Sequence, residues 1–516
     1  MYDELESLCR SISSKQFWPE GWIAVKRELQ TDSAPKETLR LTALELLLRP
    51  TDLVQRVRSI VLSQEMRGYD LDYSEGNAAQ PLEVIMAQTE ALARSLGKAA
   101  AMDTSALEEL LPDLLTSQGR LWSFGCGLAE GSDQPEAIWS RLTNQLIAPE
   151  KTEKRVETLC GFINELHKAN PLLANVLLDR TVENDGLAPW YPRFEASIPI
   201  DKQGVARLMH SLTAGKTPIA AYRSLAWGGA TSSISGDDLS QLVTEIAARS
   251  NGFDVGLEIT AMRIHSYPDK AKCSGDIIDA GRKLLRHIEF SKELDNHDYN
   301  LAAVVQACLA GDDSTELTKQ ICRKLKNAVA KPGFYSFNHG YLLESLLIVQ
   351  PSATLDEFLG VQEYEHEAGC RIFDYVWSWN KNPLDVVPPE QVVAWCRQDS
   401  QVRFPRIAAF ITVSRNIDKP GERAWSEAAL QLLKDAPDRS AVLKEFVNQL
   451  VDIHSWSGSR AAVIEANAKL LDQLIDYPDS RVVDFLLDEK RRIHEVIESE
   501  RTREDSFDKQ RDERFE

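Results

Sequence analysis

The chain has 516 residues, of which 43% are hydrophobic and 27% are charged, values typical of a folded globular protein rather than a disordered one. Its 59 basic and 79 acidic residues give a formal charge of -20, which disfavours binding to nucleic-acid phosphates over most of the surface. Eight cysteines without a CxxC pair, and the lack of a signal sequence or a bilayer-length apolar run, predict a cytoplasmic protein without membrane segments.

The N-terminal part predicts a helical hairpin followed by a loop. Residues 38–48 carry a strong helical period, Pro50 ends it, and the same period resumes over 52–65. Residues 68–80 contain Gly, Asp, Ser and Asn with little periodic apolarity, which indicates a surface loop. We therefore expect 1–80 to form an N-terminal helical segment.

The central part predicts a repeated array of helix pairs. From residue 103 the pairs recur at roughly 30 to 45 residues, the spacing of HEAT-like repeats. Helix starts with Pro, Asn or Asp divide the chain, as at 133–136, 170–171 and 236–238. Short links imply antiparallel neighbours. We assign 81–380 to a central helical-repeat array.

The C-terminal part continues the pattern after one ambiguous stretch. At 372–379 aromatic and β-branched residues favour a strand, but the apolar spacing also fits a helix, which we favour because the neighbours are helices. The proline-rich run 382–389 predicts a rigid connector, and 381–500 a C-terminal helical-repeat block. The almost wholly charged tail, 501–516, is either a solvated helical extension or a frayed end. The predicted fold is all-α, an α-solenoid of HEAT-like antiparallel helix pairs.

Glycine-rich stretches suggest phosphate binding at first sight. Residues 214–217 look like the end of a phosphate loop, but that loop needs glycine where His210 stands, and Pro218 follows where a helix should start. A helix-to-helix turn is the better interpretation. The glycines at 124–127 and 227–229 do not follow strands, so we expect them to end helices or to let two backbones pass closely.

Metal sites and nucleophilic catalysis lack a complete set of residues. The nine histidines show no HExxH pattern, and the nearest pair, His366 with Cys370, supplies two ligands where zinc needs three or four. No GxSxG nucleophile elbow occurs, and the nearest composition, 456–460, predicts a helix N-cap at Gly458 or Ser459. We expect no catalytic residue, no cofactor and no metal.

Aromatic residues in or beside the predicted turns are the candidate binding residues. Aromatic anchors dominate the energetics of protein interfaces, although in solenoids they also fill the seams between repeats. The candidate protein-binding residues are Trp190, Tyr191, Phe334, Tyr335, Phe337, Trp377 and Trp379.

Several short motifs are similar to a known family. They are Asn382-Pro383-Leu384-Asp385, Trp395-Cys396, Phe404-Pro405, Ala436-Pro437-Asp438-Arg439, Trp456-Ser457-Gly458-Ser459 and Arg511–Glu516, with further likeness over 124–130 and 256–265. Together they resemble the C-terminal helical-repeat region of large bacterial NLR-like STAND ATPases, several of which act in antiphage defence. The resemblance implies a sensor that recognises a foreign protein. In that family an effector and an ATPase with a true phosphate loop precede the repeats. This sequence shows neither an effector nor such an ATPase.

Three functions follow from these patterns. The leading hypothesis is a non-enzymatic scaffold that binds a protein, either a foreign protein or a separate ATPase or effector subunit. The alternatives are an enzyme of unrecognised type, such as a hydrolase with a pocket near His339 to Trp379, and a structural subunit of a constitutive complex.

Overall fold

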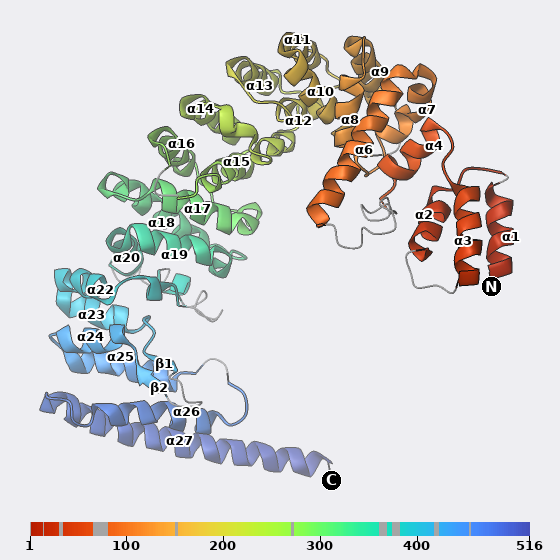
Figure 1. Ribbon diagram of the computed structural model, residues 1–516. Coiled ribbons are helices and arrows are strands. Elements are labelled where there is room, and N and C mark those ends of the chain that lie inside the picture. The colour runs from red at the N-terminus through yellow and green to blue at the C-terminus, as the bar shows by residue number, and fades with distance from the viewer. Residues whose placement is uncertain are drawn as a thin grey trace. The chain divides into compact units, whose positions relative to one another are not determined.

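The computed structural model describes residues 2–13, 15–29, 35–64, 81–149, 153–269, 273–360, 369–373, 382–416, 423–453 and 456–515. Over these ranges the chain is all-α, as predicted, and its strands are limited to one short antiparallel pair (Figure 1). The contacts divide the chain into two compact units, Met1–Val255 and Gly256–Glu516. Each unit is described by itself.

The described part of the first unit consists of helices. Its α-helices are α1 (Tyr2–Ser13), α2 (Pro19–Glu28), α3 (Pro35–Leu48), α4 (Leu53–Val57), α6 (Leu82–Met102), α7 (Thr104–Leu114), α8 (Leu121–Glu130), α9 (Pro135–Ile147), α10 (Glu157–Ala169), α11 (Pro171–Val182), α12 (Tyr191–Glu195), α13 (Lys202–Ala214) and α14 (Gly236–Ala247). The described residues also form a π-helical turn, η1 (Arg58–Leu62), and the 3-10 helices η2 (Ala188–Trp190), η3 (Ile219–Ala226) and η4 (Ala230–Ser233).

Capping residues mark where these helices begin and end. The Asn170 side chain accepts a hydrogen bond from the backbone N–H of Leu173 at 3.1 Å, which confirms the predicted helix start. At the end of α13, Gly215 adopts a left-handed φ of 67°. The phosphate-like sequence 214–217 is therefore a helix end, as predicted.

Glycines bring α6, α8 and α10 into close contact. A Cβ atom on Gly125 would lie 2.1 Å from the Thr158 carbonyl oxygen, and one on Gly127 would lie 2.0 Å from the Arg94 carbonyl oxygen. Because these obstacles are backbone atoms, a side chain cannot be accommodated by a rotamer change. The prediction that these glycines let two backbones pass closely is confirmed.

The second unit continues the helical pattern. Its α-helices are α15 (Phe253–His265), which crosses the division between the units, α16 (Gly275–Arg286), α17 (Asp298–Cys308), α18 (Thr315–Val329), α19 (Gly340–Val349), α20 (Pro351–Leu359), α22 (Pro389–Cys396), α23 (Ser400–Ala408), α24 (Glu427–Asp435), α25 (Arg439–Val451), α26 (Arg460–Ala468) and α27 (Ser480–Phe515). The 3-10 helices are η6 (Lys292–His297), η7 (Asp312–Ser314), η8 (Ser336–His339), η9 (Pro383–Val386), η10 (Arg397–Asp399) and η11 (Lys469–Leu474).

A short hairpin interrupts the helices of the second unit. Strands β1 (Ser414–Asn416) and β2 (Arg423–Trp425) pair antiparallel, with Ser414 opposite Trp425. The Trp425 indole N–H donates to the Leu470 carbonyl oxygen at 3.0 Å, which ties the hairpin to η11. The sequence analysis did not predict these strands, because three residues are too few to show an alternating pattern.

The C-terminal helix includes the residues predicted as a charged tail. Helix α27 continues without a break past residue 500, so the tail is a helical extension of α27. It contacts α26, where Glu504 accepts hydrogen bonds from the Ser459 hydroxyl at 2.7 Å and from the Ala461 backbone N–H at 3.1 Å. Ser459 in turn caps α26 through the backbone N–H of Ala462, which confirms the predicted cap.

The predicted segment boundaries differ from this division. The proposed limits near residues 80 and 380 adjoin the stretches 65–80 and 374–381, which lie outside the described residues. Residues 369–373 are helical, whereas most of the ambiguous stretch 372–379 is likewise outside. Within the described ranges, no helix combines the length and apolarity that crossing a bilayer requires.

Candidate protein-binding site

Two helix starts in the second unit are held together by carboxylates. The 3-10 helix η6 runs directly into α17, and η8 runs directly into α19. The Asp298 carboxylate accepts hydrogen bonds from the backbone N–H groups of Tyr341 at 2.8 Å and Leu342 at 3.1 Å. The Asn338 side-chain amide donates to Asp295 at 2.8 Å. The first turn of α19 is therefore fixed to the first turn of α17.

This junction carries four exposed aromatic side chains, which we call the aromatic face: Tyr299, Tyr335, Phe337 and Tyr341. Their exposed fractions are 61%, 53%, 37% and 60%, respectively. Tyr299 and Tyr341 meet edge to face with ring centroids 6.2 Å apart, and the rings of Tyr335 and Phe337 lie 5.4 Å apart. Exposed rings that contact one another present amphipathic area at a small entropic cost on binding.

The same junction has a buried aromatic layer. His339 is 1% exposed and stacks on Phe334 with centroids 5.2 Å apart and an interplanar angle of 12°. Phe290 meets the imidazole edge to face at 5.4 Å. Phe334, a predicted binding residue, is only half-buried, but its ring packs against His339. It therefore supports the junction rather than forming part of its exposed area.

Two carboxylates flank the buried imidazole. His339 Nε2 lies 3.2 Å from Asp295 Oδ1, and its Nδ1 lies 3.9 Å from Asp298 Oδ1. Both ring nitrogens and Asp295 Oδ1 are buried, and this contact lacks the geometry of a regular hydrogen bond. Asp295 is nevertheless the nearest charged group to the imidazole.

Burial shifts the ionisation of these groups. It raises the pKa of Asp298 to about 6, although the two backbone N–H donors favour the carboxylate and oppose the shift. It lowers the pKa of His339, which the neighbouring Asp295 carboxylate partly offsets. Burial therefore favours the neutral form of both groups.

The buried histidine is shielded from solvent. His339 is 1% exposed, so its ring nitrogens are not accessible from the surface. Among the described residues, no group of three or more His, Cys, Asp or Glu side chains is placed to hold a metal ion. Of the other residues that suggested a hydrolase pocket, Cys370 is half-buried in the helical stretch 369–373, and His366 lies outside the described residues.

The other predicted binding residues lie elsewhere. Trp377 and Trp379 fall outside the described residues. Trp190 is half-buried in the first unit at the end of η2. Tyr191 was expected at the surface, but it is fully buried, and this prediction is corrected. Its hydroxyl has a partner in the core, which explains why an aromatic residue beside a turn faces inwards.

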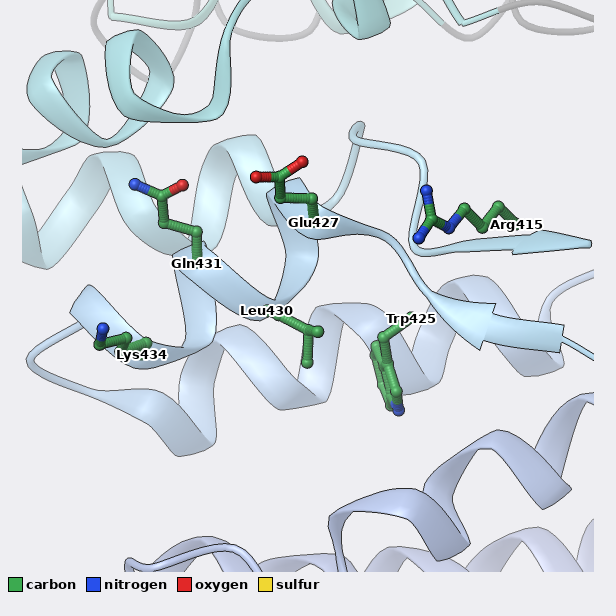
Figure 2. A pocket seen from close by; sticks show the side chains of 6 residues that line it. All are labelled: Arg415, Trp425, Glu427, Leu430, Gln431 and Lys434. Atoms are coloured by element: carbon green, nitrogen blue, oxygen red, sulfur yellow. The ribbon is translucent and has the colours of Figure 1, made fainter. Parts of the chain in front are cut away.

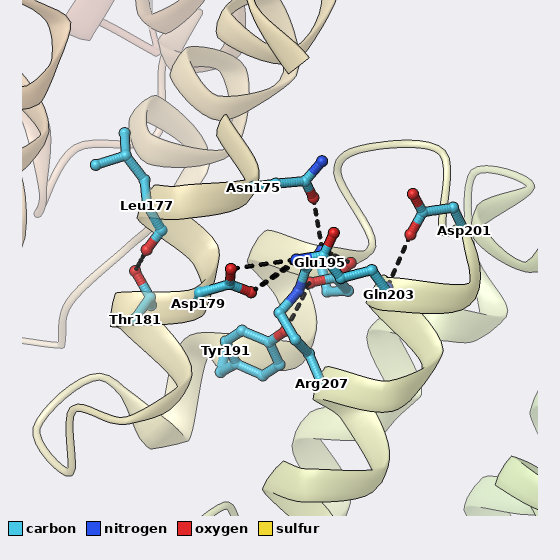
Figure 3. A network of polar contacts seen from close by, with 10 residues as sticks. Asn175, Leu177, Asp179, Thr181, Tyr191, Glu195, Asp201, Gln203 and Arg207 are labelled. Carbon is cyan, nitrogen blue, oxygen red and sulfur yellow. Dashed lines mark hydrogen bonds and ion pairs between the residues drawn. The ribbon is translucent and has the colours of Figure 1, made fainter. Parts of the chain in front are cut away.

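That partner belongs to a buried ion-pair network (Figure 3). The Tyr191 hydroxyl donates to Glu195 at 2.6 Å, and Arg207 binds the same carboxylate through two nitrogens at 2.8 and 3.0 Å. The remaining guanidinium N–H groups reach Asp179 at 3.1 Å and Asn175 at 3.0 Å. Burial raises the pKa of Tyr191 well above its usual range. Because the charges are satisfied internally, the network is a structural core element.

A shallow pocket of about 410 Å³ in the second unit is lined by both polar and apolar residues. Its walls are one face of α24 together with the hairpin, and its lining residues are Arg415, Trp425, Glu427, Leu430, Gln431 and Lys434 (Figure 2). Leu430 is half-exposed at its centre, with Arg415 and Lys434 toward opposite sides. The lining contains no serine, cysteine or histidine.

Comparison with known proteins does not identify a relative. No family description matches the chain, and no curated protein matches it.

Two of the four exposed rings were missed by the sequence analysis. Tyr299 and Tyr341 each stand in the first turn of a helix, off the apolar stripe that the following residues form. A large aromatic residue outside the apolar stripe is the signal that could have found them. Their contact with each other depends on the packing of α17 against α19, which the sequence does not reveal.

Proposed function

We propose that this chain is a non-enzymatic helical scaffold that binds another protein through the aromatic face. Tyr299, Tyr335, Phe337 and Tyr341 supply large rings with hydroxyl groups at three of the four positions. Such side chains fill apolar pockets on a partner while their polar ends hydrogen-bond at the rim. The expected partner therefore presents apolar side chains surrounded by polar groups.

One observation carries this proposal. The four rings remain exposed although the protein buries most of its large apolar side chains elsewhere, and they are clustered in pairs on a junction whose backbone is fixed by Asp298. A rigid support lowers the entropic cost of binding.

The resemblance to the repeat region of NLR-like STAND ATPases suggests the biological role. We propose a HEAT-like α-solenoid that acts in the bacterial cytoplasm as a sensor module in antiviral defence. Its partner would then be a phage protein, or a separate ATPase or effector subunit. The all-α fold of the described residues is compatible with such a solenoid.

Site-specific photo-crosslinking tests the binding surface. The full chain with Tyr341→p-benzoylphenylalanine, expressed in bacteria with and without phage infection, should form a discrete crosslinked product with one protein. The additional substitution Tyr299→Ala should reduce that product at least about tenfold, because Tyr299 and Tyr341 would act as paired anchors worth about 2 kcal/mol or more each.

A matched probe at Phe507→p-benzoylphenylalanine controls for non-specific reaction. Phe507 is an exposed aromatic residue of α27, with an exposed fraction of 60% that matches that of Tyr341. Equal crosslinking from Phe507 and Tyr341, or a product unaffected by Tyr299→Ala, would contradict the aromatic face as the binding surface. Thermal unfolding of each variant shows whether the fold is retained.

A further inference from the structure

We propose that the partner of the aromatic face presents arginine to it, so that a guanidinium group stacks on the ring of Tyr341 and pairs with Glu344. This inference rests on the proposed function, because it names the chemistry of the group that the aromatic face binds. It adds a requirement for positive charge to the apolar contact, and that requirement can be measured separately.

Tyr341 offers a ring face to a partner. Its side chain is 60% exposed, and its contact with Tyr299 is edge to face, with an interplanar angle of 89°. One face of Tyr299 is covered by His265, whose ring lies at an angle of 9° with centroids 5.4 Å apart. The faces of an aromatic ring carry partial negative charge and attract a cation within about 6 Å of the centroid. Tyr341 is therefore the ring of this pair that is better placed to receive a cation.

Elsewhere the chain covers exposed rings with its own arginine side chains. The guanidinium group of Arg460 lies 5.4 Å from the ring centroid of Trp456, and that of Arg503 lies 5.7 Å from the ring centroid of Phe507. Both of these rings are at least half exposed. In the part of the chain that the structure describes, no lysine or arginine lies over the three tyrosines of the aromatic face. These tyrosines thus lack the internal cation that other exposed rings have.

Carboxylates adjoin the same rings. Glu344 follows Tyr341 by three residues on α19, and side chains at this spacing are neighbours on one side of a helix. Burial raises the pKa of Asp298, and the negative charge of Glu344 adds to that shift, which places Glu344 close to the junction. A guanidinium group over Tyr341 would therefore find a ring face and a carboxylate together.

Arginine fits this arrangement better than lysine. Its planar guanidinium group stacks on a ring while its N–H groups can still donate to a carboxylate. An ammonium group is a more strongly hydrated point charge. The formal charge of -20 on the chain also favours association with a basic segment. The expected partner is thus a protein segment in which arginine stands beside apolar residues.

Fluorescence anisotropy with labelled peptides measures this preference on the full chain. The probes are three short peptides of equal length that alternate leucine with arginine, with lysine, or with citrulline, the neutral isostere of arginine. At pH 7.5 and physiological salt, the arginine peptide should bind at least about fivefold more tightly than the citrulline peptide. It should also bind more tightly than the lysine peptide.

Substitutions locate the preference on the aromatic face. Tyr341→Leu keeps apolar area but removes the ring, so it should weaken binding of the arginine peptide about fivefold, whereas Tyr341→Phe should retain it. Glu344→Gln should also weaken binding. The matched controls are Trp227→Leu, at an exposed aromatic residue of the first unit, and Glu390→Gln, which removes the same charge from the exposed start of α22. Neither control should change the affinity, and thermal unfolding shows that each variant folds.

The outcomes separate this inference from the proposed function. Undetectable binding of the arginine peptide, equal binding of the arginine and citrulline peptides, or equal affinity of wild type and Tyr341→Leu would overturn the inference. Equal binding of the arginine and lysine peptides would overturn the assignment to arginine. Failure of the photo-crosslinking in bacteria, with the preference for the arginine peptide retained, would overturn the proposed function alone.

Discussion

Arg207 and His339 are both nearly inaccessible to water, but their surroundings satisfy them to different degrees. Arg207 finds oxygen acceptors on Glu195, Asp179 and Asn175. His339 has carboxylates nearby, yet neither of its ring nitrogens makes a hydrogen bond. A fully satisfied buried network specifies one arrangement of the core.

The substitution Arg207→Ala is expected to destabilise the first unit by about 3–5 kcal/mol, because it leaves the Glu195 carboxylate buried without its cation. Equilibrium unfolding in urea, followed by circular dichroism, measures the change. Arg481→Ala is the control: this arginine is largely exposed beside Asp479, so its removal should change the stability little. Equal effects of the two substitutions would contradict a structural role for the buried network.

The substitution Asp298→Asn is expected to change the pH dependence of stability. Since burial raises the pKa of Asp298 from 3.8 to about 6, the folded chain holds a proton that the unfolded chain has already released. The resulting stabilisation is complete below pH 3.8 and is lost as the pH rises to about 6. A difference of about 2 units corresponds to about 3 kcal/mol.

Melting temperatures at pH 4.5 and 7.5 test this linkage. Asparagine does not titrate, so the melting temperature of Asp298→Asn should rise relative to wild type by several degrees between the two pH values. The lowered pKa of His339 changes the pH dependence of stability in the opposite direction. His339 is present in both proteins, so its contribution largely cancels in the comparison. A constant difference between variant and wild type would show that Asp298 does not titrate in this range.

At the scale of elements, close helix packing depends on particular glycines. Helices α6, α8 and α10 approach so closely that Gly97, Gly125, Gly127 and Gly161 each face backbone atoms of a neighbouring helix. Helix propensity alone would favour alanine at these positions. Backbone contact explains why glycine stands at these positions. The packing of the three helices offsets the local cost in helix propensity.

The substitution Gly127→Ala should destabilise the first unit by at least about 1–3 kcal/mol, because the new Cβ would lie 2.0 Å from the Arg94 carbonyl oxygen and the helices must separate. Thermal unfolding measures the effect. Gly275→Ala is the matched control in the first turn of α16, where nothing lies within 4 Å of a new Cβ. That change should be neutral or slightly stabilising. A loss as large as that of Gly127→Ala would contradict the packing argument.

At the scale of the whole molecule, the contacts divide the chain into two compact units. The first includes the Arg207 network and the glycine-packed helices, and the second includes the aromatic face and the hairpin. Cooperative unfolding usually follows such compact units. Perturbations of one core should therefore remain within its unit.

Hydrogen exchange on full-length Arg207→Ala tests this independence. Amides of the first unit, for example in α13 and α11, should lose protection, while amides of α18 and α25 in the second unit keep theirs. The control is wild-type protein under the same conditions. A uniform loss of protection along the chain would show that the two units unfold as one.

The candidate site was only partly predictable from the sequence. Tyr335 and Phe337 were identified because aromatic residues in or beside predicted turns are candidate anchors of a protein interface, and both are exposed. Tyr191 met the same criterion but is buried, because its hydroxyl donates a hydrogen bond to Glu195 inside the core. Tyr299 and Tyr341 were missed, since the contact that pairs them joins residues far apart in the chain. Whether a tyrosine is buried depends on a hydrogen-bond partner that the local sequence does not identify.

The sequence by itself determined the all-α class, the positions of many helix starts such as Asn170 and Ser459, and the turn at Gly215, because apolar period, capping and backbone freedom are local properties. The tertiary structure alone decided the division near residue 255, the Arg207 network and the placement of His339 between two carboxylates. These features depend on which helices pack together, and packing brings together side chains whose separation in sequence carries no signal of their contact.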